Sequence, residues 1–149
     1  MNIEKLGKRC CGCGVCEAVC PKKCIALRAD SEGFSVPVVD AQACVDCGLC
    51  LRRCPVEQAE TDEDCGAPTT YAAHARDDEA LAASSSGAMF TALAKDTLAR
   101  GGRVYGAVME TPGDVRIVGT DEESGLAPMR RSKYVQGTLG AATLDEVQD

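Results

Sequence analysis

Apolar and polar positions alternate in two short segments of the N-terminal part, and this pattern predicts a β-hairpin. Residues 24–29 (CIALRA) and 34–39 (FSVPVV) are rich in β-prone side chains, and the DSEG between them has the composition of a turn. Pro37 lacks the amide that a central strand needs, so we expect its strand at a sheet edge. Residues 1–9 are polar with one apolar pair, which is compatible with an edge strand or an irregular entry segment.

A helical period marks the segment AMFTALAKDTLARGG in the C-terminal half. Its apolar positions recur three and four residues apart. They predict one buried helix face, formed by Phe90, Leu93, Ala94, Thr97 and Leu98. A serine of the preceding SSSG supplies the expected N-cap, and Gly101 and Gly102 supply the stop.

Further elements are expected on both sides of this helix. RVYGAVME is apolar on both faces and predicts a buried strand, TPGD predicts a turn, and VRIVGT predicts a partner strand. TTYAAHA and SKYVQ are candidate strands. DDEALAA, the residues around Glu122 and the segment from Thr143 are candidate short helices. Because the chain stops inside the last of these, we expect it to be part of a longer domain.

Composition and charge narrow the classes of function. The chain has 149 residues, eleven cysteines and a formal net charge of −7. Its polar N-terminus lacks the apolar segment of a signal peptide, and no apolar run approaches the length of a membrane span. We therefore expect a cytoplasmic protein whose cysteines bind metal rather than form disulfides. The negative charge and the scarcity of aromatic residues argue against nucleic acid as a partner, and the charge suits docking to a redox partner protein.

Two copies of one cysteine motif, C-x2-C-x2-C-x3-C-P, dominate the N-terminal part. This is the bacterial spacing for a pair of 4Fe-4S clusters, in which the fourth cysteine of each copy binds the other cluster. One cluster is therefore expected on Cys10, Cys13, Cys16 and Cys54. The second is expected on Cys44, Cys47, Cys50 and Cys20.

Zinc and disulfides are the alternatives for these cysteines. Zinc sites usually take two CxxC pairs separated by a longer loop, whereas here three cysteines share one loop, twice. The spacing therefore favours clusters, with a zinc-binding interaction module as the weaker interpretation. Three cysteines lie outside the motifs: we expect Cys11 to be a spare small residue, Cys24 a buried structural thiol and Cys65 a linker position.

These patterns predict an α+β fold with an internal boundary. A bacterial dicluster ferredoxin-like domain is expected over residues 1–56, followed by an acidic linker over 57–68, where like charges resist compaction. The acidic residues of that linker are Glu57, Glu60, Asp62, Glu63 and Asp64. An incomplete α/β domain is expected over residues 69–149.

Beyond the cysteine motifs, the segments YAAHARDDE, SSSGAMFTAL, GGRVYGAV and RRSKYVQ occur in this order. The arrangement resembles the N-terminal part of the coenzyme F-420 hydrogenase/dehydrogenase beta-subunit family. The resemblance implies an iron–sulfur flavoprotein that passes electrons between its clusters, a bound FAD, and a deazaflavin such as coenzyme F-420 or another acceptor. Members of that family are considerably longer, so the resemblance also implies a truncated flavoprotein domain.

Candidate cofactor-binding residues follow from the helix start and the resemblance. Ser84, Ser85, Ser86 and Gly87 precede a helix whose exposed amides can bind a phosphate, although simple capping is the alternative. With Lys133, the adjacent Arg130 and Arg131 are candidates for contacts with a flavin or its pyrophosphate. His74, the one histidine, has no acidic or cysteine motif around it and is expected to be structural. No catalytic residue is identified.

Two functional hypotheses result. The first is an electron-transfer protein with two 4Fe-4S clusters joined to part of a flavoenzyme. The second is a stand-alone ferredoxin-type carrier or redox-complex adaptor without flavin. Flavin content distinguishes them.

Overall fold

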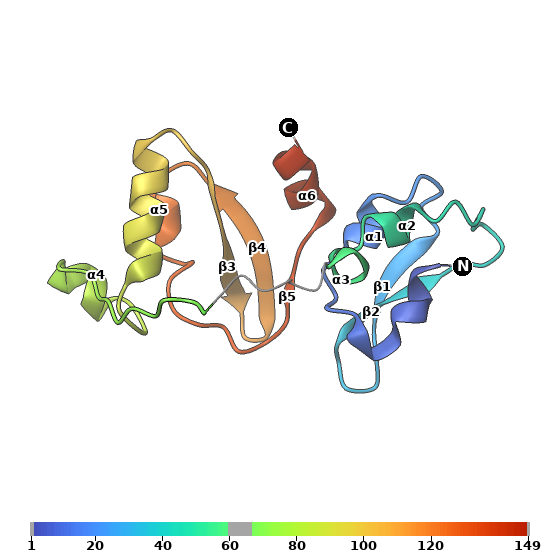
Figure 1. The fold of residues 1–149 in the computed structure, drawn as a ribbon, viewed down its shortest axis with the longest axis horizontal. Helices are drawn as coiled ribbons and strands as arrows, with labels where there is room; N and C mark the ends of the chain where they lie inside the picture. The colour runs from blue at the N-terminus through green and yellow to red at the C-terminus, as the bar shows by residue number, and fades with distance from the viewer. Residues whose placement is uncertain (1, 60–66, 149) are drawn as a thin grey trace. The chain divides into compact units, whose positions relative to one another are not determined.

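The chain divides into two compact units in the computed structural model, which describes residues 2–59 and 67–148. One unit comprises Met1–Glu63 together with Thr138–Asp149, and the other comprises Asp64–Gly137. Helices and strands occur in both, as the ribbon shows (Figure 1). The mixed α+β composition that the sequence predicts is therefore present. No helix among the described residues is long and apolar enough to cross a membrane.

The first unit is built around a two-stranded antiparallel hairpin with short helices beside it (Figure 1). Its strands are β1 (Ile25–Ala29) and β2 (Ser35–Val39), and its helices are η1 (Ile3–Arg9), α1 (Val15–Ala18), α2 (Leu49–Arg52), α3 (Pro55–Gln58) and α6 (Ala141–Gln148). Asp30 closes the turn, because its carboxylate accepts hydrogen bonds from the amides of Glu32 and Phe34, both at 2.9 Å. The predicted hairpin is confirmed, and Pro37 pairs with Leu27 on a strand that has only one neighbour.

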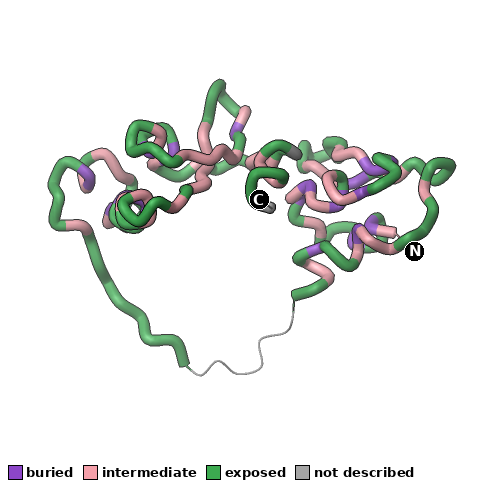
Figure 2. The backbone as a smooth tube through the Cα atoms, turned by 90° about the horizontal axis from the view of Figure 1, so that it is seen from above, coloured by how far each residue is buried: buried purple, intermediate pink, exposed green. Residues whose placement is uncertain are grey.

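The N-terminal segment, which the sequence left undecided, forms the 3-10 helix η1 and supplies the main aliphatic side chains of the core. The Asn2 side chain caps it by accepting from the amide of Glu4 at 3.0 Å. Ile3 and Leu6 are buried beside Ile25. The other buried members of this core are cysteines, namely Cys16, Cys20, Cys24, Cys50 and Cys54. Buried positions accordingly lie on several separate segments of this unit rather than along one helix (Figure 2).

The second unit packs one helix against an antiparallel sheet. Its elements are α4 (Asp78–Ala82), α5 (Met89–Ala99), β3 (Val104–Thr111), β4 (Asp114–Thr120) and η2 (Glu123–Leu126), with β5 (Gly137–Thr138) completing the strand order β3-β4-β5. The turn predicted at TPGD is present between β3 and β4, with Gly113 at φ +88°. Leu126 is fully buried and forms the core with Ala94 and Met129.

Helix α5 forms where predicted, but its buried face and its cap differ from the expectation. Thr91 and Ala94 are buried, whereas Leu93 is 63% exposed. The helix is covered by η2 and β3, so the face centred on Thr91 and Ala94 turns inward. The N-cap is Ala88 at φ +59° without a side-chain hydrogen bond, not a serine. Ser84 instead donates its hydroxyl to the carbonyl of Ala80 in α4 at 2.8 Å.

Three predicted strands are also corrected. The RVYGAVME segment does form β3, but it is half-buried rather than buried on both faces, because β3 is the edge of an open sheet. TTYAAHA is irregular, with Tyr71 exposed and a single backbone bond from the Ala75 amide to Gly87. SKYVQ is irregular as well, with Tyr134 exposed. Only Gly137 and Thr138 pair in that region, as β5.

The α/β character expected for the second part is not confirmed, because β3 and β4 pair antiparallel. Two boundaries also differ from the expected ones. Glu57 belongs to α3 of the first unit rather than to a linker, and the last residues, from Thr138, group with the first unit. The rest of the predicted acidic segment, Glu60, Asp62, Glu63 and Asp64, lies outside the described residues together with Cys65.

Candidate metal centre

A cavity in the first unit is lined by cysteines from both motifs. Cys10, Cys13 and Cys16 come from the first motif, and Cys54 is the last cysteine of the second motif. Beside these four, Cys11 is a fifth cysteine in this lining. The apolar lining comes from η1, α3 and the hairpin, through Ile3, Leu6, Leu27, Pro55 and Val56. This set of four cysteines is the one that the sequence predicts for one cluster.

A second cavity has the complementary lining. Cys44, Cys47 and Cys50 of the second motif surround it together with Cys20, the last cysteine of the first motif. Cys24 is a fifth cysteine in this lining. The two motifs therefore exchange their fourth cysteines between the cavities, as expected from the crossed pattern of two-cluster ferredoxins.

Matching glycines position the third cysteine of each motif. Gly14 at φ +80° and Gly48 at φ +70° hold the left-handed conformation directly before α1 and α2. Such a conformation is open to glycine without steric cost. It turns the chain from loop into helix, so that Cys16 and Cys50 each occupy the second helical position and are buried.

The fourth cysteines leave these short helices toward the opposite cavity. Cys54 is the N-cap of α3, and Pro55 occupies the first helical position, where its missing amide costs nothing. Cys20 follows α1 and accepts a hydrogen bond at its carbonyl from the Lys23 amide at 3.1 Å. Both crossing cysteines are buried.

Amide donors and exposure vary among the thiols. The amide of Gly12 points at the sulfur of Cys10 at 3.4 Å, an arrangement that stabilises negative charge on a ligand sulfur. Arg52 donates to the carbonyl of Cys47 at 2.9 Å and thereby braces the second loop. Cys47 is exposed, whereas Cys50 is buried. The second cavity therefore approaches the surface at Cys47.

Burial controls the protonation of several thiols. Burial raises the pKa of Cys16 to about 12, with the neighbouring Cys13 adding to the effect, and it also raises the pKa of Cys13. At Cys20 burial acts in the same direction, but hydrogen bonds from the amide and thiol of Cys24 and from the amides of Lys22 and Lys23 together outweigh it and lower the pKa. Because only thiolates bind metal, binding at such sites releases protons and weakens as the pH falls.

The possible metal donors of the first unit gather at two separate places. Among residues 2–59 and 67–148, no group of three or more His, Cys, Asp or Glu side chains converges to hold a single metal ion. Five thiols, four of them the predicted ligands, line each of two cavities with apolar walls. A cubane presents four corners to four thiolates, so this distribution suits a 4Fe-4S cluster.

The candidate cofactor residues of the second unit are partly brought together. Ser84, Ser85, Ser86 and Gly87 line an open cleft with Arg130 and Arg131. Lys133 is absent from this lining, because its ammonium group donates to the carbonyls of Pro128 at 2.9 Å and Arg130 at 2.6 Å. Burial lowers the pKa of Lys133. Ala73, Ala88, Met89 and Phe90 also line the cleft. No sequence pattern marked them as cofactor contacts, since Phe90 was expected only in the buried face of the helix.

Gly87 has a packing role in this cleft. A Cβ atom at this position would overlap the carbonyl oxygen of Ala73, because the segment before α4 runs directly against it. Because this segment lies so close to Gly87, the amide of Ala75 can donate to the carbonyl of Gly87 at 2.7 Å. His74, in this segment, is exposed and hydrogen-bonds through Nδ1 to the carbonyl of Ala75.

Two cysteines that sequence reasoning set aside lie at the cavities. Cys24 is buried as expected, but its sulfur is 3.4 Å from that of Cys20. Its hydrogen bond with Cys20 raises the pKa of Cys24 to about 11. Cys11 lines the first cavity and is exposed. The spacing of four residues between Cys20 and Cys24 was the available sequence signal for the first of these contacts.

Comparisons with known proteins agree with this site. Residues 9–58 match the model of the 4Fe-4S dicluster domain family. A component of the Na(+)-translocating ferredoxin:NAD(+) oxidoreductase complex of Acetobacterium woodii is 41% identical over 46 residues, which cover 31% of this chain and 13% of that protein. NADH-quinone oxidoreductase subunit I 2 of Geobacter metallireducens is 37% identical over 62 residues, covering 38% of this chain and 47% of that protein.

A third relative is the ferredoxin-type protein NapF of Haemophilus influenzae, 36% identical over 44 residues that cover 30% of this chain and 25% of that protein. The chain therefore matches less than half of the length of each of these relatives. No solved structure matches it. The cysteine-rich segment is a 4Fe-4S dicluster segment related to ferredoxin-type subunits of redox complexes.

Proposed function

We propose that the first unit holds two 4Fe-4S clusters and transfers electrons for a multi-subunit oxidoreductase. One cluster is held by Cys10, Cys13, Cys16 and Cys54. The other is held by Cys44, Cys47, Cys50 and Cys20. The observation that carries this proposal is the exchange of fourth cysteines, since each cavity takes three thiols from one motif and one from the other.

The protein determines which amides and which apolar side chains surround the thiolates, and these affect how easily the site accepts negative charge. When bound, such clusters take up and release single electrons at potentials between about −700 and +450 mV. Amides that point at ligand sulfurs, such as that of Gly12 toward Cys10, stabilise added negative charge. Apolar walls, such as Ile3 and Leu6 at the first cavity, limit access of water and favour the less charged state.

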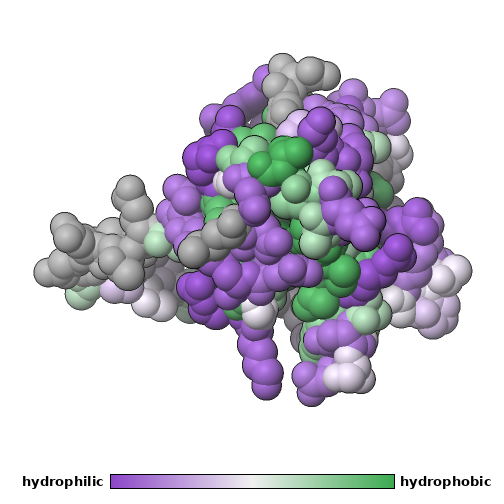
Figure 3. Space-filling model, turned by 90° about the vertical axis from the view of Figure 1, so that its right-hand side faces the viewer, coloured by the Kyte–Doolittle hydropathy of each residue, from purple (hydrophilic) through white to green (hydrophobic). Residues whose placement is uncertain are grey.

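A redox partner protein is the proposed source or recipient of these electrons. Two of the relatives are named as parts of ferredoxin:NAD(+) and NADH-quinone oxidoreductases, which supports a subunit role here. The exposed Cys47 brings the second cavity to the surface of the first unit. The face of this unit turned to the viewer in Figure 3 exposes hydrophobic residues among hydrophilic ones.

For the second unit we propose a flavin or deazaflavin, FAD or coenzyme F-420, as the group that exchanges electrons with the clusters. The support is the cleft that gathers Ser84, Ser85, Ser86 and Gly87 with Arg130 and Arg131. Hydroxyl groups and guanidinium groups are suitable donors for a pyrophosphate. The alternative is a ferredoxin-type carrier without flavin, in which the second unit contacts a partner protein.

Anaerobic purification tests both parts of this proposal, the two clusters in the first unit and the flavin in the second. Iron and inorganic sulfide are measured for the clusters, and flavin is measured separately after release by heat. Iron and sulfide with stoichiometric flavin support the flavoprotein, whereas iron and sulfide without flavin support the carrier. A colourless protein with stoichiometric zinc would contradict the cluster proposal itself.

A further inference from the structure

The two cavities differ in the charge of the residues around them, although the motifs that form them are copies of one another. The second motif lies 34 residues after the first, so each position of one has a counterpart in the other. The structure keeps this correspondence, because Pro21 and Lys22 line the second cavity as Pro55 and Val56 line the first. An exposed cationic side chain therefore stands at the second cavity where an aliphatic one stands at the first.

Two further positions differ between the copies in the same direction. Arg52, in α2, corresponds to Ala18 in α1, and Lys23 corresponds to Glu57. Both basic side chains are exposed. The guanidinium group of Arg52 donates to the carbonyl of Cys47 at 2.9 Å, which holds a positive charge beside one of the proposed ligands. The second cavity is therefore the one with added basic residues.

The loop that carries these charges also brings the second cavity to the surface. Cys47 is exposed, whereas its counterpart in the first motif, Cys13, is half-buried. Val45 lies two residues before Cys47 and is 58% exposed. Among the described residues, Asp46 is the acidic member of the cavity lining. An exposed apolar side chain bordered by charged ones is the usual composition of a protein contact surface.

From this asymmetry we infer that the surface formed by Lys22, Lys23, Val45, Cys47 and Arg52 docks a redox protein whose contact face is acidic. The inference rests on the proposed function, because it presupposes a cluster in the second cavity. One electron passes between that cluster and the redox centre of the partner, and no bond is made or broken. Complementary charge steers the two proteins together and speeds their association.

The charge of the whole chain, −7, would by itself favour a basic partner. Residues 2–59, however, contain eight lysines and arginines against seven aspartates and glutamates, so the negative excess lies outside this segment. At physiological ionic strength, charges are screened beyond about 8 Å, so a partner in contact with Cys47 is attracted mainly by the basic residues beside it. A nearly neutral segment is also too weakly charged for nucleic acid, whose binding domains are strongly basic.

The test measures electron transfer from the reduced full chain to two one-electron acceptors of opposite charge, an acidic plastocyanin and a basic cytochrome c. Lys22→Glu should slow transfer to plastocyanin by about tenfold at low ionic strength and accelerate transfer to cytochrome c. Arg52→Gln, which keeps a donor for the carbonyl of Cys47, should change both rates in the same directions as Lys22→Glu. Lys8→Glu is the matched control, because Lys8 is exposed on η1, is not part of the second cavity's lining and gives the same change in net charge.

Opposite responses of the two acceptors separate docking from a change in the cluster itself, because an altered cluster potential would move both rates in one direction. Equal effects of Lys22→Glu and Lys8→Glu, or parallel changes for both acceptors, would overturn the inference. A difference that persists in salt concentrated enough to screen charges would also overturn it. Iron per chain is measured for each variant, and loss of iron in both Lys22→Glu and Arg52→Gln would show a structural role instead. Absence of iron from wild type would refute the proposed function itself, which keeps the two failures distinguishable.

Discussion

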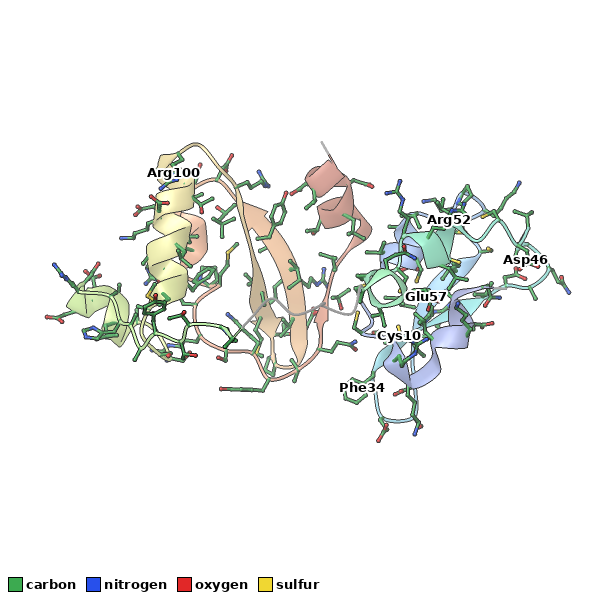
Figure 4. All side chains as sticks on the ribbon, in the orientation of Figure 1. Cys10, Phe34, Asp46, Arg52, Glu57 and Arg100 are labelled. Carbon is green, nitrogen blue, oxygen red and sulfur yellow. The ribbon has the colours of Figure 1, made fainter. Side chains whose placement is uncertain are left out.

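Lys5 and Glu57 form an ion pair at 2.5 Å that joins η1 to α3, two elements that line the first cavity. Arg9 approaches the other oxygen of the same carboxylate at 3.5 Å. Figure 4 labels Glu57, which belongs to α3, and Cys10, which directly follows η1. The pair therefore fixes the N-terminal helix beside α3, and with it two walls of the cavity.

Replacing Glu57 with Gln should lower the thermal unfolding midpoint of the first unit at pH 7. The hydrogen bond from Lys5, which outweighs burial, lowers the pKa of Glu57 below its usual 4.5. A carboxylate whose pKa is lower in the folded than in the unfolded state stabilises the folded protein fully at pH values above the unfolded-state pKa. This stabilisation is lost as the pH falls through the folded-state pKa. The difference in unfolding midpoint between wild type and Glu57→Gln should therefore be largest at neutral pH and should disappear below pH 4.5.

Glu32→Gln serves as the matched control, because Glu32 is exposed in the turn of the hairpin. Wild type and both variants are compared at each pH, so that acid effects common to all three cancel. Equal unfolding midpoints for Glu57→Gln and Glu32→Gln at pH 7 would show that the ion pair does not stabilise this unit. A midpoint difference between wild type and Glu57→Gln that grows as the pH falls would show the same.

Replacing Cys16 or Cys50 with Ala should remove about one cluster's share of the iron. Each is the buried third cysteine of its motif and lines a different cavity. Cys11→Ala is the control, since Cys11 is exposed and is not assigned as a ligand. Full iron content in either Cys16→Ala or Cys50→Ala would disprove the ligand assignment, as would an equal loss in the control.

Removal of iron should loosen the first unit and leave the second unchanged. The core of the first unit consists largely of cysteines, so little aliphatic packing remains when the metal is withdrawn. Hydrogen exchange should accelerate at the amides of β1 and β2 after anaerobic chelation. Amides of β3 and β4, which belong to the other unit, provide the internal reference. Equal acceleration in both hairpins would contradict this dependence.

In the second unit, Leu126→Ala should lower the free energy of unfolding by about 2–5 kcal/mol, the usual range for a buried leucine. Leu126 is fully buried against Ala94 and Met129. Leu93→Ala removes the same atoms from a side chain that is 63% exposed, and should cost far less. Denaturant unfolding measures the free energy of unfolding of both variants. Similar decreases for Leu126→Ala and Leu93→Ala would show that Leu126 is not part of the core.

The sequence predicts the first unit well because its signals are local and chemically specific. The hairpin follows from β-prone segments that flank Asp30 and Gly33, and the structure pairs them in register. The four cysteines at each cavity follow from motif spacing, which fixes where each thiol leaves its loop. Cys24 was harder to place, because its proximity to Cys20 depends on how the hairpin returns to the cavity.

The second unit is predicted less completely because its boundaries depend on tertiary contacts. Phe90 and Leu93 have the right spacing for a buried face, yet η2 and β3 cover the side of α5 that carries Thr91 and Ala94. Lys133 has the right charge for a phosphate, but it binds two backbone carbonyls instead. Periodicity cannot show which face of a helix is covered or which acceptor a lysine reaches.

Iron and inorganic sulfide per chain, measured after anaerobic reconstitution, test the central claim most directly. Two 4Fe-4S clusters require about eight atoms of each, in a brown protein that dithionite bleaches. A colourless protein that excludes iron and sulfide, or that holds zinc in their place, would contradict the account.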